Sequence, residues 1–198
     1  MQQLVMKDFI VQWKFLIWYL LYPFLLYVIS QDSRNVFTAI IIIIPILATM
    51  TTFHNDDKNS SEQVLNSLPV ARKQIVVAKY IFSLLILIVS VMISSVMIGI
   101  EFGIEAISFI KVTAVSSINI VIIYLSFAIP IHFIFGYRKG RFITFIILLV
   151  PVLIGELFFK VNIEKTILQS SVLLSICAIC LLFISILVCT KLYEQRDL

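Results

Sequence analysis

The stretch YIFSLLILIVSVMISSVMIGI, Tyr80–Ile100, contains no Asp, Glu, Lys or Arg. An α-helix rises about 1.5 Å per residue, so a run of about 20 apolar residues matches the hydrocarbon core of a bilayer. A single segment in lipid must satisfy its own backbone hydrogen bonds, and a helix does so. The stretch therefore predicts a membrane-spanning helix.

Similar apolar runs occupy most of the chain, which has 198 residues, of which 61% are hydrophobic and 13% are charged. Soluble domains are about 45–50% apolar and about 25% charged. We predict an all-α, polytopic membrane protein with six transmembrane helices in one domain, residues 1–198. The six spans are expected at about 15–30, 36–53, 80–100, 112–135, 142–159 and 167–190.

The distribution of basic residues predicts the orientation of the chain. With the N-terminus inside, 11 of the 15 Lys and Arg residues fall on inner segments, and only Arg34, Lys111, Lys160 and Lys165 fall outside. Because Lys and Arg favour the cytoplasmic side, both termini are expected in the cytoplasm. The net charge of +4 follows from this bias and does not indicate nucleic-acid binding.

The opening residues, 1–14, predict a helix lying in the inner membrane interface. Val5, Met6, Phe9, Ile10 and Trp13 fall on one helical arc, with Lys7 and Lys14 on another side. The alternative is that the first span begins early. The interfacial interpretation is favoured because Lys7, Asp8 and Gln12 are costly in hydrocarbon.

The inner segment 60–72 is polar and contains helix start and stop signals. Ser60 and Gln63 have the spacing of a capping box, which predicts a short helix over about Ser61–Asn66. Leu68-Pro69 ends it and begins the helix that enters the membrane as the third span. These signals fit either a stiff lever or a solvated loop, and physical reasoning alone leaves both open.

The stretch SLPVARKQIVVAKY, Ser67–Tyr80, following the acidic NDDKNSSEQ, resembles the loop between the second and third spans of type-2 ABC exporter permeases, the small bacterial membrane subunits of peptide, bacteriocin and drug efflux systems. The start of the chain, MQQLVMKDFIVQWK, looks like their opening elbow helix. The residue likeness covers about Asp56–Tyr80, while the layout agrees over the whole chain.

The resemblance implies that the segment 60–72 contains a cytoplasmic coupling helix, over about Ser61–Asn66, that docks into a separate ATP-hydrolysing subunit. By position, Glu62 and Leu65 would contact that subunit, and Ser67, Leu68, Pro69 and Arg72 would form the junction to the third span. It also implies a second permease subunit, identical or related, and export of amphipathic peptides or hydrophobic compounds through a bacterial cell membrane.

Catalytic chemistry is not expected in this chain. No Walker-type glycine loop followed by Lys-Ser or Lys-Thr occurs, so ATP and Mg²⁺ are expected on the partner ATPase and no cofactor in this chain. No H-E-x-x-H pattern occurs either. Cys177 and Cys180 form a CxxC inside an apolar run, where cysteine acts as a small apolar residue, and no metal site is expected.

Two polar residues inside predicted spans remain open to two interpretations. Asn119 either lines a transport pathway or hydrogen-bonds a neighbouring helix. Glu156 either lines a vestibule or forms an exposed ion pair with Lys160, four residues on.

Three other functions stay as alternatives: a substrate-binding membrane subunit of a vitamin importer, an intramembrane enzyme, and a scaffold or immunity protein. Tight ligand binding without an ATPase would indicate the first.

Overall fold

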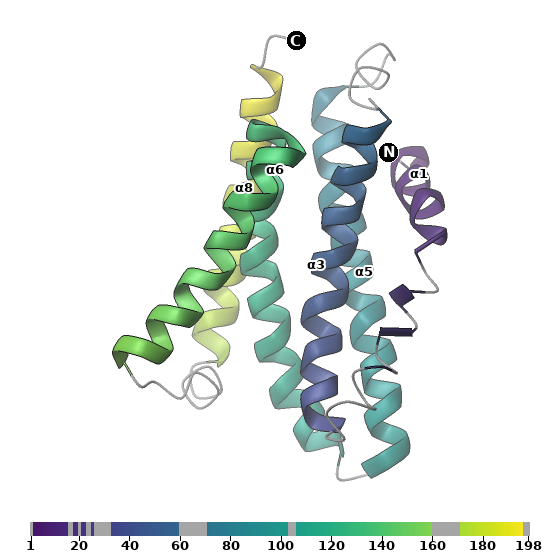
Figure 1. Cartoon of the computed structure of the whole chain (residues 1–198), viewed down its shortest axis with the longest axis vertical. Coiled ribbons are helices and arrows are strands. Elements are labelled where there is room, and N and C mark those ends of the chain that lie inside the picture. Colours follow the sequence, from purple (N-terminus) through teal and green to yellow (C-terminus); the bar gives the residue numbers. More distant parts are fainter. Residues whose placement is uncertain are drawn as a thin grey trace.

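The computed structural model describes residues 2–15, 18, 19, 21, 22, 25, 33–59, 71–102, 106–159 and 171–195. All regular secondary structure in these residues is helical, as the sequence predicts. The helices are α1 (Gln2–Trp13), α3 (Ser33–Lys58), α5 (Arg72–Phe102), α6 (Ala106–Phe159) and α8 (Ser171–Glu194) (Figure 1).

Four of these helices contain stretches long and apolar enough to cross a membrane: Val36–Lys58, Arg72–Ile100, Thr113–Ile147 and Val172–Glu194. The predicted count of six is not confirmed. Most of the predicted first span, 15–30, lies outside the described residues. The predicted spans 112–135 and 142–159 both fall in α6, in two helical arms on either side of a kink at Gly136.

The chain reverses inside α6 at one residue. Gly136 has φ 73° and ψ 172°, a conformation that is essentially restricted to glycine because it has no Cβ. Figure 1 shows α6 turning back partway along its length. The reversal takes a single residue, because Tyr137–Arg141 already belong to the second arm.

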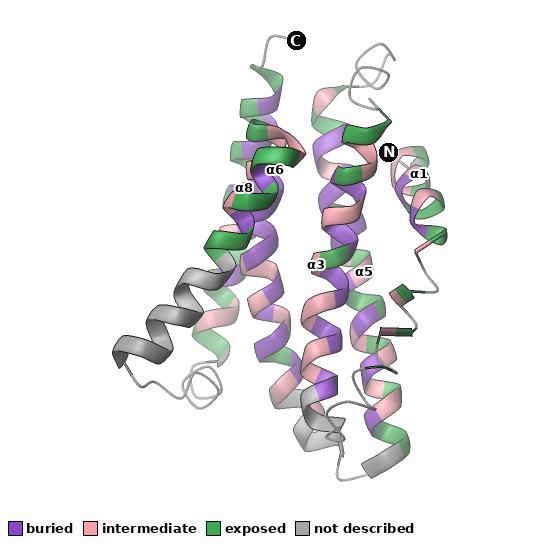
Figure 2. Cartoon of the chain, in the orientation of Figure 1, coloured by how far each residue is buried: buried purple, intermediate pink, exposed green. Residues whose placement is uncertain are grey.

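Helix α3 lies at the centre of the bundle and α8 at its edge. In their most apolar stretches 56% of α3 is buried inside the structure, against 22% of α8, and Figure 2 shows the difference along the two helices. The main core cluster includes Ile41, Val76, Leu125, Ile129 and Cys189, which come from all four long helices.

Hydrogen bonds between helices cross this core. Thr49 of α3 donates to Ser83 of α5 at 3.1 Å. The Tyr80 hydroxyl of α5 is 2.6 Å from the Ser185 hydroxyl of α8, and Ser185 donates to the carbonyl of Ser126 in α6. Such bonds average about 0.6 kcal/mol each in membrane proteins, so they fix the relative rotation of the helices more than they add stability.

The two ends of the described chain lie at the same end of the bundle. This end also holds the end of α3, the start of α5 and the end of α8 (Figure 1). The Arg72 guanidinium donates to the Glu194 carbonyl at 3.2 Å, so the first residue of α5 is beside the last turn of α8. The end of α3 and the start of α5 flank residues 60–70, which lie outside the described residues.

Candidate functional site

Four charged side chains from three helices meet at this end of the bundle, and we call them the ion-pair cluster: Lys7 and Asp8 of α1, Asp56 of α3 and Lys79 of α5. The Lys79 ammonium is 3.0 Å from the Asp8 carboxylate and 2.6 Å from that of Asp56. The Lys7 ammonium is 2.8 Å from Asp56 and 3.5 Å from Asp8. Each charge therefore contacts two opposite charges.

Asp8 and Lys79 are the two members of the ion-pair cluster that are most shielded from solvent. The side chains of Asp8 and Lys79 are each 5% exposed, whereas Lys7 is 32% exposed. A buried ion pair contributes little net stability, but removal of one partner leaves an unpaired buried charge and costs about 3–5 kcal/mol. Burial lowers the pKa of Lys7, but the carboxylates of Asp56 and Asp8 outweigh burial and raise this pKa above 10.5. Lys7 is thus charged at neutral pH.

The positions of these residues along their helices explain why they need one another. Asp56 lies in the last turn of α3, where a carboxylate is disfavoured by the negative end of the helix dipole. The two lysines offset that cost. Lys79 lies two turns into α5. Along the chain, Asp56 therefore precedes the segment 60–72 and Lys79 follows it.

The polar side of α1 faces the bundle and its apolar side faces outward. Asp8 and Gln12 are buried, while Met6, Ile10 and Trp13 are more than 60% exposed. Gln12 donates to the Thr51 hydroxyl at 3.0 Å and to the carbonyl of Ala48, both in α3. The predicted apolar arc is therefore free to contact lipid.

An aromatic layer continues from the ion-pair cluster towards the turn in α6. The Lys79 ammonium lies 5.4 Å from the centre of the Phe53 ring, within the range of a cation–π contact. Phe53 stacks on His132 of α6, with ring centres 4.8 Å apart. A Cβ built on Gly140 would lie 2.5 Å from Nδ1 of His132, so only glycine allows the second arm of α6 to pack this closely.

The structure places the predicted site residues as follows. Glu62, Leu65, Ser67, Leu68 and Pro69 lie outside the described residues. Arg72 begins α5 and hydrogen-bonds the end of α8. The coupling contact predicted for these residues stays a prediction.

The two polar residues within predicted spans, Asn119 and Glu156, are described to different extents. Asn119 is buried and its amide donates to the Ser175 hydroxyl of α8 at 2.8 Å, so it does bond a neighbouring helix. Glu156 belongs to the second arm of α6, but its side chain lies outside the described ones.

The sequence alone did not predict the ion-pair cluster. Lys7 and Asp8 were interpreted as charges that favour an interfacial helix, and neither was paired with Lys79. A signal was present, because Asp8 and Lys79 each stand among apolar residues at a membrane boundary, where an unpaired charge is costly.

A family model described as ABC-2 family transporter protein matches residues 3–194. The match covers nearly the whole chain, including α1, the ion-pair cluster and the segment 60–72. Neither a curated protein nor a solved structure gives a significant match.

Proposed function

Because the chain belongs to the ABC-2 family of transporter proteins, we propose that it is the membrane subunit of an ATP-driven exporter in a bacterial cell membrane. The subunit works with a separate cytoplasmic ATPase, since the sequence has no phosphate-binding glycine loop of its own. ATP and Mg²⁺ bind to that partner.

One observation carries the proposal: the ion-pair cluster joins α1 to both helices that flank the segment 60–72. Asp56 is at the end of α3 and Lys79 is near the start of α5, and both bind the same part of α1. A push on the segment from the cytoplasm therefore moves the end of α3, the start of α5 and α1 as one unit. This is the arrangement that a docking lever requires.

The aromatic layer gives the movement a route to the rest of the bundle. Phe53 stacks on His132, and Arg138 of α6 lies 3.8 Å from Asp57 of α3. Closely packed interiors transmit displacement because they deform little. A shift at the end of α3 thus reaches the turn at Gly136, and α6 in turn packs along α8.

The proposal includes a second permease subunit, identical or related, and an apolar pathway between the two. Broad apolar surfaces of α5 and α8 support this part of the proposal. Leu85, Ile88 and Met92 of α5 and Phe183 and Leu187 of α8 are all exposed. Amphipathic peptides or hydrophobic compounds are the proposed cargo, because an apolar pathway suits apolar groups.

Copurification with the cognate ATPase from gently solubilised membranes tests the proposal. Wild type is expected to retain the ATPase, and a Glu62→Arg, Leu65→Asp double variant is expected to lose it. Lys139→Glu changes an exposed charge at the same end of the bundle and is expected to retain it. If no ATPase copurifies with the wild-type chain, the exporter proposal is wrong. If the double variant retains as much ATPase as wild type does, the docking site lies outside the segment 60–72.

A further inference from the structure

The two arms of α6 are attached to the bundle in different ways. The first arm, which precedes Gly136, is bonded to α8 at two levels. The Asn119 amide donates to the Ser175 hydroxyl at 2.8 Å, and the Ser185 hydroxyl donates to the carbonyl of Ser126. These bonds fix the first arm against α8.

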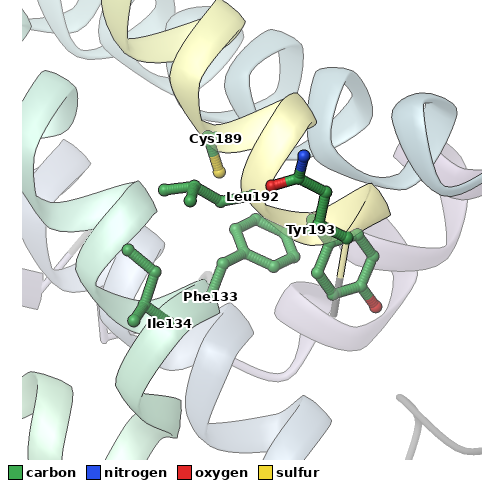
Figure 3. A pocket seen from close by; sticks show the side chains of 6 residues that line it. Phe133, Ile134, Cys189, Leu192 and Tyr193 are labelled. Atoms are coloured by element: carbon green, nitrogen blue, oxygen red, sulfur yellow. The ribbon is translucent and has the colours of Figure 1, made fainter. Parts of the chain in front are cut away.

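Aromatic contacts hold the first arm at its end next to the reversal. Phe133 meets Tyr193 of α8 edge-on, with ring centres 4.9 Å apart, and it meets Phe53 of α3 edge-on at 5.4 Å. Figure 3 shows the Phe133 and Tyr193 rings side by side between the two helices. The first arm is therefore anchored on both α8 and α3 up to the reversal.

The second arm contacts the bundle through a narrow face. Gly140 and Thr144 are buried, whereas Phe142, Phe145 and Ile146 are each more than half exposed. The Thr144 hydroxyl donates to the carbonyl of Gly140 at 2.9 Å. Thr144 therefore directs its hydroxyl into its own arm and not towards the first arm.

The second arm also touches the end of α3, through exposed side chains. The Arg138 guanidinium lies 3.8 Å from the Asp57 carboxylate, and the Arg138 side chain is 90% exposed. The Tyr137 and His54 rings have their centres 5.0 Å apart. An exposed ion pair is weak because water screens it, so the second arm is held less firmly than the first. A displacement of the end of α3 still reaches the second arm directly.

Two buried polar side chains of the first arm face the second arm and have no hydrogen-bond partner within the described part of the chain. The Tyr124 hydroxyl faces Thr144, and Nδ1 of His132 lies against Gly140. Tyr124 is 7% exposed and His132 is 3% exposed. A buried polar group without a partner is costly, whereas the same group in contact with water is not. Separation of the two arms therefore relieves a cost at both side chains.

We propose that the second arm of α6 swings away from the first arm about Gly136 and lets water reach His132 and Tyr124. Gly136 has φ 73°, and glycine tolerates a wide range of dihedral angles, so this one residue can absorb the movement. His132 lies close to the reversal, where the chain leaves the membrane, so water has a short route into the gap. The close packing of Gly140 on His132 shuts the gap in the observed position. The hinge is a property of the chain alone and does not depend on the proposed export function.

The reaction of an introduced cysteine with a water-soluble, cationic methanethiosulfonate reagent tests the hinge on the full chain in lipid nanodiscs. The native cysteines, which are all free, are first replaced by alanine. Thr144→Cys then places a thiol on the buried face of the second arm, where separation of the arms exposes it. Thr49→Cys is the matched control, because Thr49 and Thr144 are each 1% exposed and Thr49 is buried between α3 and α5. We expect the Thr144→Cys thiol to react about tenfold faster or more, because it needs only a local opening.

Two further substitutions should shift the reaction rate of Thr144→Cys in opposite directions. Gly140→Ala crowds His132 and disfavours the closed position, so the rate should rise about fivefold or more. Tyr124→Phe removes the unpartnered hydroxyl and keeps the ring, so the rate should fall about fivefold. The rate of Thr49→Cys should not respond to either substitution.

Circular dichroism checks that each variant keeps its helix content, and the comparison with Tyr124→Phe stands if Gly140→Ala does not fold. Equal rates for Thr144→Cys and Thr49→Cys, in both the parent chain and the Gly140→Ala chain, would overturn the proposal. An equal change at both thiols would overturn it too, because the whole bundle would then be loosened. A rate that does not fall in Tyr124→Phe would also contradict it.

Discussion

The Lys79 ammonium lies 2.6 Å from the Asp56 carboxylate, and this contact joins the start of α5 to the end of α3 across the segment 60–72. The same ammonium contacts Asp8 of α1 at 3.0 Å. One side chain therefore holds three helices together at the end of the bundle where the segment begins and ends.

Replacement of Lys79 is expected to destabilise the fold strongly. Lys79→Met leaves the Asp8 carboxylate, which is 5% exposed, with only the more distant Lys7 as a partner. We expect a loss of about 3–5 kcal/mol in the free energy of unfolding. Denaturant unfolding in mild detergent, followed by circular dichroism, measures it.

The control is Lys73→Met, which changes an exposed lysine in the first turn of the same helix and should fall within about 0.5 kcal/mol of wild type. A double variant, Asp8→Leu with Lys79→Met, should recover part of the loss because no buried charge is left unpaired. If Lys79→Met and Lys73→Met behave alike, the ion-pair cluster is not buried as described.

A second prediction concerns the close packing at Gly140. A Cβ there would lie 2.5 Å from Nδ1 and 3.3 Å from the backbone Cα of His132, so Gly140→Ala must displace the His132 ring or the second arm of α6. Overpacking of this kind costs about 1–3 kcal/mol. Gly99→Ala is the matched control, because nothing lies within 4 Å of its added Cβ.

The two glycine variants are expected to shift the unfolding midpoint in opposite directions. Alanine is the better helix former by about 0.5–1 kcal/mol, so Gly99→Ala should raise stability slightly while Gly140→Ala lowers it. A Gly140→Ala protein as stable as wild type would contradict the contact with His132.

The helical nature of the described chain was predictable from sequence because lipid leaves a single apolar segment no other way to satisfy its backbone. The reversal at Gly136 lies between the predicted spans 112–135 and 142–159, and two successive spans require a turn between them. Its restriction to one residue was not predictable, because that depends on the dihedral angles of Gly136, which a pattern of apolar residues does not report.

The ion-pair cluster was harder to predict, because its members are far apart in the chain. Asp8 and Lys79 are 71 residues apart. Charge patterns along one helix do not report partners on another. The apolar arc of α1 is a local pattern, and Met6, Ile10 and Trp13 from it are exposed. The coupling residues Glu62 and Leu65 remain predictions, because they lie outside the described residues.

The bond between Asn119 and Ser175 allows the two interpretations of Asn119 to be separated. If Asn119 serves to join α6 and α8, then Asn119→Ala should lower stability by about 0.6–1.7 kcal/mol, and a double-mutant cycle with Ser175→Ala should show coupling. If Asn119 instead lines the pathway, transport should change while the cycle shows no coupling. Unfolding in detergent and flux in vesicles are the two measurements.

The last prediction tests whether the tie between α1 and α5 takes part in energy coupling. Asp8→Asn removes the charge that holds α1 to Lys79, but Lys79 and Lys7 both keep Asp56 as a partner at 2.6 Å and 2.8 Å. The fold and the binding of the ATPase are therefore expected to survive. Coupling energies between sites are typically 1–3 kcal/mol, so ATP-dependent flux in reconstituted vesicles should fall by about fivefold or more.

ATP hydrolysis measured in the same Asp8→Asn vesicles is expected to fall less than flux does, because the ATPase still docks but its movement no longer reaches α5 through α1. Lys14→Gln changes an exposed charge just after α1 and should leave both rates as in wild type. If ATP-dependent flux in Asp8→Asn vesicles equals that in wild-type vesicles, the ion-pair cluster only stabilises the bundle. A loss of ATPase binding in that variant would instead place α1 within the docking surface itself.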